Sequence, residues 1–199
     1  MPTETTYDDL LGRIRTLVAT SDRVPVVGIS GHGGAGKSTL ARALGADLGL
    51  GADGVVPTDR FYAETCGPDA GMWEQHDWAL LEALVRGART TPPPDRLAYA
   101  YRWWTGETGV RDDPMPPVLI VEGIRLFSDR TSDWFDLSVW IDVDPDTAGA
   151  RAKVRNLLQG DDAAELGLWD TKWIPEGHAY AATVRPELRA DLVVPARTQ

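Results

Sequence analysis

Eight residues near the start of the chain form a phosphate-binding sequence. Residues 31–38 read Gly-His-Gly-Gly-Ala-Gly-Lys-Ser and fit the pattern G-x-x-x-x-G-K-[ST]. In such a loop the backbone N–H groups turn toward a phosphate, and the N-terminus of the following helix adds positive potential. Lys37 can reach the β- and γ-phosphates of a nucleotide, and the Ser38 hydroxyl can bind Mg²⁺. The predicted nucleotide-contacting residues are Gly31, Gly33, Gly34, Ala35, Gly36, Lys37, Ser38 and Thr39.

Two acidic residues follow predicted strands and are candidates to work beside this loop. Asp59 comes just after a short strand at residues 55–56, and in an open α/β sheet such a residue points into the crevice where ligands bind. Asp59 is therefore a candidate base or metal-linked carboxylate, with a helix N-cap or a solvated loop position as the alternative. Glu122 ends a clear buried strand at residues 118–121, where P-loop proteins hold Mg²⁺. Ser38 and Glu122 are the predicted metal ligands.

A pair of arginines is a candidate phosphate clamp. Arg151 and Arg155 are four residues apart in a predicted helix at residues 146–158, so both lie on one face of that helix. In a chain this acidic, a face with two arginines is suited to bind phosphate. A solvated helix face explains the same spacing equally well.

The middle of the chain carries polar and aromatic candidates for binding a second substrate. Glu74, His76 and Asp77 cluster at the start of a predicted helix at residues 77–86, and their side chains could bind hydroxyl groups. A capping Asp beside solvated polar residues is the alternative for this cluster. Residues 97–104 include four aromatic side chains that could stack on a substrate ring. Ordinary hairpin packing is slightly favoured for each aromatic residue taken singly.

These candidate residues need a parallel sheet to bring them together. Short apolar runs predict strands at residues 24–30, 55–56, 118–121, 136–143 and 190–194. Apolar periodicity predicts helices at residues 6–19, 39–50, 77–86 and 146–158, and residues 169–180 are expected to be helical or lid-like. Residues 97–117 suggest a hairpin with a turn-rich return after residue 104. The prediction is a three-layer α/β fold with a parallel sheet flanked by helices, plus a small hairpin and a lid helix. We expect one domain over residues 1–199, with the lid at about 146–180.

Composition limits the partners of this chain. Its 199 residues carry a net charge of −10 with no basic run, which argues against nucleic acid or an anionic membrane as a partner. Cys66 is the only cysteine, so an internal disulfide cannot form and a cytoplasmic location is expected. Residues 1–9 are acidic and polar, unlike a signal peptide, and no apolar run approaches membrane-spanning length. Homo-oligomerisation is left open.

The order of these pieces resembles the uridine kinase group of P-loop small-molecule kinases, which is close to phosphoribulokinase and type I pantothenate kinase. Beyond the glycine loop, residues 59–62 (Asp-Arg-Phe-Tyr) resemble the group's D-x-F-Y segment, and residues 118–123 resemble its v-x-x-E-G strand end. Residues 142–156 align with its lid helix, and residues 185–194 resemble its closing segment. The resemblance spans most of the chain after residue 24.

What the resemblance implies is a kinase with the P-loop NTPase fold that uses ATP and Mg²⁺. The implied acceptor is a hydroxyl group of a small molecule, with a nucleoside such as uridine or cytidine preferred. Lys37, Arg151 and Arg155 then stabilise the transferring phosphoryl group, and Asp59 orients or deprotonates the acceptor. The positions implied to contact the acceptor are Asp59, Tyr62, Glu74, His76, Asp77, Tyr101 and Arg102.

The chain departs from the group's pattern in the lid helix and on the acceptor side. Asn156 replaces the lid Asp, and Ala148 and Ala152 stand where the group often has Arg. Arg102 occupies the Asp position of a Y-D-[FW] segment, and residues 73–77 only echo the group's F-D-H-P-D. Another small alcohol, such as a sugar or a specialised metabolite, is therefore the alternative acceptor. A regulatory NTPase switch is less favoured, because the chain lacks an Asn-Lys-x-Asp motif.

Overall fold

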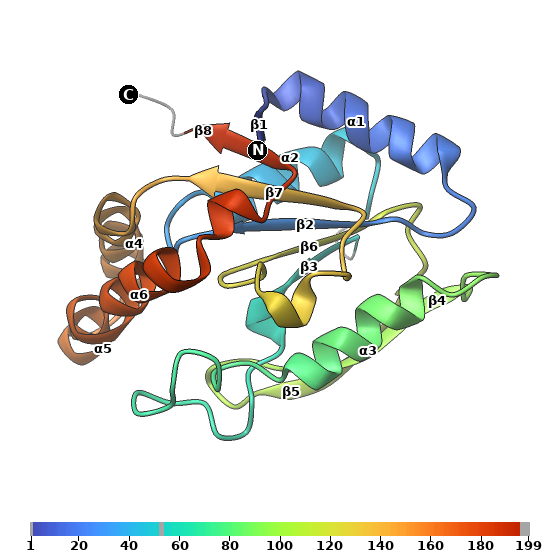
Figure 1. Cartoon of the computed structure of the whole chain (residues 1–199). Coiled ribbons are helices and arrows are strands. Elements are labelled where there is room, and N and C mark those ends of the chain that lie inside the picture. The colour runs from blue at the N-terminus through green and yellow to red at the C-terminus, as the bar shows by residue number, and fades with distance from the viewer. Residues whose placement is uncertain (1, 52–53, 196–199) are drawn as a thin grey trace.

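The computed structural model describes residues 2–51 and 54–195, and six parallel strands form the centre of that part of the chain (Figure 1). Their order across the sheet is β1-β8-β7-β2-β6-β3. The strands of this sheet are β1 (Thr3–Glu4), β2 (Val26–Gly31), β3 (Val55–Pro57), β6 (Leu119–Gly123), β7 (Leu137–Asp142) and β8 (Leu192–Pro195). The α-helices are α1 (Tyr7–Thr20), α2 (Lys37–Asp47), α3 (Trp78–Ala88), α4 (Pro145–Gln159), α5 (Ala163–Leu168) and α6 (Ile174–Val184).

Both faces of the sheet are buried, because alternate side chains of each strand enter different cores. Val26 belongs to a core that includes Leu81 of α3, whereas Val27 belongs to a second core with Ile14 of α1 and Leu44 of α2. Figure 1 shows α1 and α2 on one side of the sheet and α3 on the other. The predicted three-layer α/β fold with a parallel sheet is therefore confirmed.

Helix α1, which the apolar periodicity of residues 6–19 predicts, packs on the sheet. Thr6 is the N-cap, and its Oγ1 accepts a hydrogen bond from the backbone N–H of Asp9 at 3.2 Å. Leu10, Leu11 and Ile14 are buried in the core on this side of the sheet. Since this face is used for packing, α1 has no unpartnered apolar stripe to offer another protein.

A hairpin of β4 (Arg96–Arg102) and β5 (Thr108–Pro114) lies outside the main sheet. Leu97 and Tyr99 are buried in the core that also contains α3. The prediction of a turn-rich return over residues 105–117 was incomplete, because most of this stretch is strand β5. Seven residue pairs across the hairpin impose the extended conformation despite the Gly, Asp and Pro content of the segment.

The last third of the chain is mainly helical. Helix α4 ends at Gln159 and is capped by Gly160, whose φ of 95° permits the left-handed C-cap. Helix α5 and a π-helix (Trp169–Trp173) then lead into α6. Strand β1, which pairs with β8, was not predicted, because two polar residues carry no periodicity. No helix within residues 2–51 and 54–195 is long and apolar enough to cross a membrane.

Candidate active site

The carboxyl ends of three neighbouring strands bring the predicted phosphate loop and the two acids together. Strand β6 pairs with β2 on one side and with β3 on the other, with Ile29 and Pro57 both opposite Glu122. The loop follows β2, Glu122 lies near the end of β6, and Asp59 follows β3 in a short 3₁₀-helix (Thr58–Arg60). Parallel strands present their carboxyl ends at the same edge, so the three segments converge there.

The glycines of the loop allow a tight turn into α2. Gly36 is the N-cap of α2 with a φ of 103°, and α2 begins at Lys37, two residues before the predicted start. Gly34 has a φ of 90°, and a Cβ there would lie 2.0 Å from the backbone oxygen of Ala148. Any side chain at Gly34 would thus collide with α4, which packs directly on the loop.

Lys37 is buried at the base of the loop. Its Nζ donates a hydrogen bond to the backbone oxygen of His32 at 3.0 Å. Burial is the main influence on this ammonium and lowers its pKa, while the nearby carboxylates of Glu122 and Asp59 oppose that shift. The amino group is held next to the loop interior, where a phosphate bound by the backbone N–H groups would need a cation.

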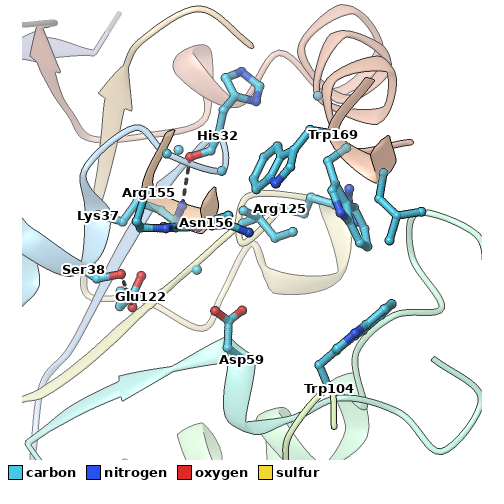
Figure 2. A pocket seen from close by; sticks show the side chains of 18 of the residues that line it. His32, Lys37, Ser38, Asp59, Trp104, Glu122, Arg125, Arg155, Asn156 and Trp169 are labelled. Atoms are coloured by element: carbon cyan, nitrogen blue, oxygen red, sulfur yellow. Dashed lines mark hydrogen bonds between the residues drawn. The ribbon is translucent and has the colours of Figure 1, made fainter. Parts of the chain in front are cut away.

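Ser38 and Glu122 form a pair of oxygen donors beside Lys37. The Ser38 hydroxyl donates to Oε1 of Glu122 at 2.9 Å (Figure 2). Burial raises the pKa of the Glu122 carboxyl, and the Lys37 charge partly offsets this. One hydroxyl and one carboxylate suit Mg²⁺, which prefers oxygen ligands and usually keeps several waters or phosphate oxygens. No group of three or more His, Cys, Asp or Glu residues able to hold a metal occurs within residues 2–51 and 54–195.

A cavity of about 410 Å³ lies over these groups (Figure 2). Its lining includes the loop, Lys37, Ser38, Glu122 and Asp59, together with Tyr62 and Arg155 from the predicted acceptor and phosphate contacts. Other polar, charged and aromatic residues also line the cavity: Trp104, Thr105, Arg125, Asn156, Asp161, Glu165, Trp169, Trp173 and Tyr180. The cavity therefore continues from the phosphate loop into an aromatic region.

Only one of the two arginines of the predicted clamp reaches this cavity. Arg155 lines it and donates to the side-chain oxygen of Asn156 at 2.7 Å. Arg151 is exposed one turn earlier on α4 and is not part of the lining. Ala148 and Ala152 are buried against Gly34 of the loop, so the positions where the uridine kinase group often has Arg here have room only for small side chains.

The predicted polar acceptor contacts before α3 lie outside the cavity lining. Asp77 is the N-cap of α3, and its Oδ1 accepts from the backbone N–H of Leu80 at 2.9 Å. Glu74 accepts from the backbone N–H of Gly71. His76 is buried with neither ring nitrogen hydrogen-bonded, and burial lowers its pKa to about 4. His76 stands behind Tyr62, with which it stacks at 5.0 Å between ring centroids.

The two predicted hairpin contacts also lie outside the lining. Tyr101 packs across the hairpin over Gly109, where a Cβ would meet the tyrosine hydroxyl at 2.5 Å. Arg102 pairs through its backbone with Phe61 and Tyr62. The neighbouring Trp104 and Thr105 line the cavity in their place. The aromatic composition of residues 97–104 indicated this segment. The hairpin register and the turn after β4 decide which of its residues line the cavity.

Arg125 is a cavity residue that sequence reasoning missed. It follows Glu122 by three residues, is buried, and adopts a φ of 60°. Its guanidinium donates to the backbone oxygen of Met72 at 2.7 Å and forms an ion pair with Glu176 of α6. The signal available was its place just beyond the end of β6, since such residues border the ligand crevice.

Comparison with known proteins finds sequence relatives among uridine kinases. No protein-family model matches the chain. The uridine kinase of Lactiplantibacillus plantarum is 26% identical over 188 residues, covering 87% of each chain. The uridine kinase of Halobacterium salinarum is 25% identical over 187 residues, covering 85% of this chain and 79% of its own. The chain is therefore similar to uridine kinases over most of its length.

Solved structures give the same fold. A protein from Silicibacter sp. TM1040, provisionally named as a fructose transport system kinase, superimposes with a TM-score of 0.76 at 24% identity. The match covers 96% of this chain and 100% of that one. A protein from Bacillus stearothermophilus, provisionally named as a uridine kinase, has a TM-score of 0.58 at 20% identity and covers 94% and 99% of the two chains. At these identities the structural likeness concerns the fold of this chain and not its substrate.

Proposed function

We propose that this protein transfers the γ-phosphoryl group of ATP, with Mg²⁺, to a hydroxyl group of a small molecule. The observation that carries the proposal is the convergence of the loop with Lys37, the Ser38–Glu122 pair and Asp59 at one edge of the sheet. These are the parts that phosphoryl transfer needs: a phosphate cradle, a cation, oxygen donors for a metal, and a carboxylate for the acceptor.

The proposed roles follow from where the side chains stand. The loop N–H groups and Lys37 bind the phosphates and stabilise charge that develops during transfer. Ser38 and Glu122 would hold Mg²⁺, which would supply positive charge to neutralise phosphate oxygens. The carboxylate of Asp59 accepts a hydrogen bond from the acceptor hydroxyl and takes its proton as the new bond forms. Arg155 supplies a second positive charge from α4.

The preferred acceptor is a nucleoside such as uridine or cytidine, in keeping with the names of the relatives. The alternative is another small alcohol, such as a sugar, because several positions implied to contact a nucleoside either differ in type or lie outside the cavity lining. The cytoplasm is the proposed compartment, since a single cysteine suits a reducing environment.

The proposal is tested by measuring ADP release from Mg-ATP with and without added acceptors. The panel consists of uridine, cytidine, fructose and glycerol, and Lys37→Ala is the control because it removes the cation at the phosphates. Turnover that depends on an acceptor and is lost in Lys37→Ala supports the kinase. Turnover independent of every acceptor supports a regulatory NTPase, and nucleotide binding without turnover supports a protein that has lost catalysis.

A further inference from the structure

The phosphate loop contains a glycine that neither its motif nor its backbone requires. Gly33 occupies one of the unrestricted positions of G-x-x-x-x-G-K-[ST]. Within the loop, positive φ angles occur at Gly34 and Gly36, so the backbone at Gly33 does not favour glycine. A side chain at Gly33 would instead meet the indole of Trp169, because a Cβ there would lie 2.8 Å from Cη2 and 3.0 Å from Cζ3 of that ring. The glycine therefore makes room for the indole.

Trp169 is held on the loop by the lid elements around it. It begins the π-helix, and its backbone oxygen accepts a hydrogen bond from the N–H of Ile174 at the start of α6. The next residue, Asp170, forms an ion pair with Lys153 of α4, with 2.7 Å between Oδ2 and Nζ. The indole is buried and forms part of the cavity lining. Single π-helical turns are rare and often occur at functional sites.

The indole stands beside the position that a γ-phosphoryl group would occupy. The Nζ of Lys37 donates to the backbone oxygen of His32, the residue that precedes Gly33. In a P-loop this lysine reaches the β- and γ-phosphates of the nucleotide. If ATP occupies the loop, its γ-phosphoryl group therefore lies near the indole that rests on Gly33. Figure 2 shows Trp169 entering the cavity from the side opposite Asp59, the proposed acceptor contact.

We propose that Trp169 determines whether the phosphoryl group passes to the acceptor or to water, by covering that group and excluding water from it. The inference rests on the proposed function and adds a residue that makes the transfer selective. In the side reaction, a water oxygen would bond to the γ-phosphorus, the bond to the bridging oxygen would break, and ADP, phosphate and a proton would be released. The edge of the indole that faces the loop consists of carbon atoms, so it fills space without offering water a hydrogen-bond partner.

The test measures ADP release by Trp169→Ala from Mg-ATP, without acceptor and with the best acceptor of the panel at saturation. The quantity compared is the ratio of acceptor-independent to acceptor-dependent release. We expect this ratio to rise by about tenfold or more, because water then reaches the phosphoryl group. Trp103→Ala is the matched control, since that indole is half-buried but outside the cavity lining, and it should change the ratio by less than about twofold. Faster hydrolysis is a gain that partial unfolding does not produce.

Gly33→Ala tests the same contact from the side of the loop. The added methyl group would collide with the indole and displace it, so the ratio should rise in this variant as well. In the double variant, Gly33→Ala should add little to the effect of Trp169→Ala, because the indole is already absent. If Trp169→Ala does not fold, judged by circular dichroism, Trp169→Leu replaces it in both experiments.

Each outcome decides the inference. A raised ratio in Trp169→Ala and in Gly33→Ala, with the ratio of Trp103→Ala unchanged, supports it. An unchanged ratio, a parallel loss of both reactions, or an equal rise in Trp103→Ala overturns it, while acceptor-dependent turnover of the wild-type protein leaves the kinase standing. A wild-type protein whose ADP release depends on no acceptor overturns both the kinase and the inference.

Discussion

At the residue scale the site depends on the carboxylate of Asp59. Its position after β3 places it at the same edge of the sheet as Glu122, and it lines the cavity with Lys37. Asp77, the other aspartate of this region considered as an acceptor contact, caps α3. Two aspartates that look alike in the sequence therefore have different surroundings, and the same substitution distinguishes their roles.

Asp59→Asn should lower kcat by roughly 10²–10⁴-fold, because Asn accepts a hydrogen bond but cannot take the acceptor proton. Nucleotide affinity should change little. Asp77→Asn should leave both rate and stability nearly unchanged, because Asn caps helices as well as Asp does. Measuring kcat at low and high Mg²⁺ separates a base from a metal-linked carboxylate, since only the latter is partly rescued by Mg²⁺. A kcat for Asp59→Asn within a few-fold of wild type would remove this residue from the mechanism.

At the element scale, helix α4 determines which charges reach the phosphates. Its buried face is occupied by Ala148 and Ala152, which pack on the glycine loop. This packing fixes the position of the helix, in which Arg155 lines the cavity while Arg151 is exposed one turn away. An i, i+4 spacing places two side chains on one face of a helix, but a contact with a bound ligand also depends on distance along the axis.

Arg155→Ala should lower kcat by about tenfold or more, whereas Arg151→Ala should change kcat by less than about twofold. The reason is that only Arg155 is within the cavity to stabilise charge on the transferring group. Steady-state kinetics of both variants, with ATP varied at saturating acceptor, provide the comparison. Equal losses in the two variants would indicate that α4 rotates or shifts when nucleotide binds.

A second element, α6, is tied to the loop before α3 by an ion cluster around the buried Arg125. Glu176 pairs with Arg125 and with Lys172, and these two cations also donate to the backbone oxygens of Met72 and Ala70. Arg125 is only 4% exposed. Removing the shared carboxylate leaves a buried cation without its counter-charge.

Glu176→Ala should lower the free energy of unfolding by about 3–5 kcal/mol, the usual cost of breaking a buried ion pair by deleting one partner. Glu187→Ala is the matched control, because Glu187 pairs with Arg185 at the surface, where the Arg185 side chain is 64% exposed. A surface pair contributes about 0–1 kcal/mol. Urea unfolding followed by circular dichroism measures the free energy of unfolding of both variants. Similar losses in Glu176→Ala and Glu187→Ala would contradict a stabilising role for the ion cluster.

At the scale of the whole molecule, burial of two histidines links stability to pH. His32 lines the cavity, whereas His76 is buried against Tyr62 outside the lining, and burial lowers the pKa of each to about 4. In an unfolded chain their pKa is about 6.5. Between these two values the unfolded chain binds more protons than the folded one, so the free energy of unfolding falls as the pH falls from about 6.5 to about 4.

Lowering the pH from 7 to 5 should therefore decrease the free energy of unfolding, by up to about 2 kcal/mol for each of these histidines. His76→Phe retains a ring against Tyr62 but cannot titrate, so its decrease should be smaller than that of the wild-type protein. His178→Ala, at an exposed position, is the control. Its free energy of unfolding should fall between pH 7 and pH 5 by at least as much as that of the wild-type protein. Urea titrations at both pH values give the comparison, and an unchanged decrease in His76→Phe would show that His76 does not contribute.

The sequence by itself determined the phosphate loop, the parallel α/β fold and the convergence of Asp59 and Glu122 on the loop. These features are local or follow from a general rule. The loop motif is contiguous, and acids that end neighbouring parallel strands must meet at the carboxyl edge of the sheet. Knowing the strands was therefore enough to know which segments come together.

Only the tertiary structure decided which side chains form the acceptor half of the cavity. Trp104 instead of Tyr101 faces inward because of the hairpin register and turn, and Arg155 instead of Arg151 because α4 packs on the loop through two alanines. Arg125 enters the site through its contact with Glu176, 51 residues away in the sequence. These outcomes depend on side-chain packing between distant segments, and periodicity within one segment does not encode that packing.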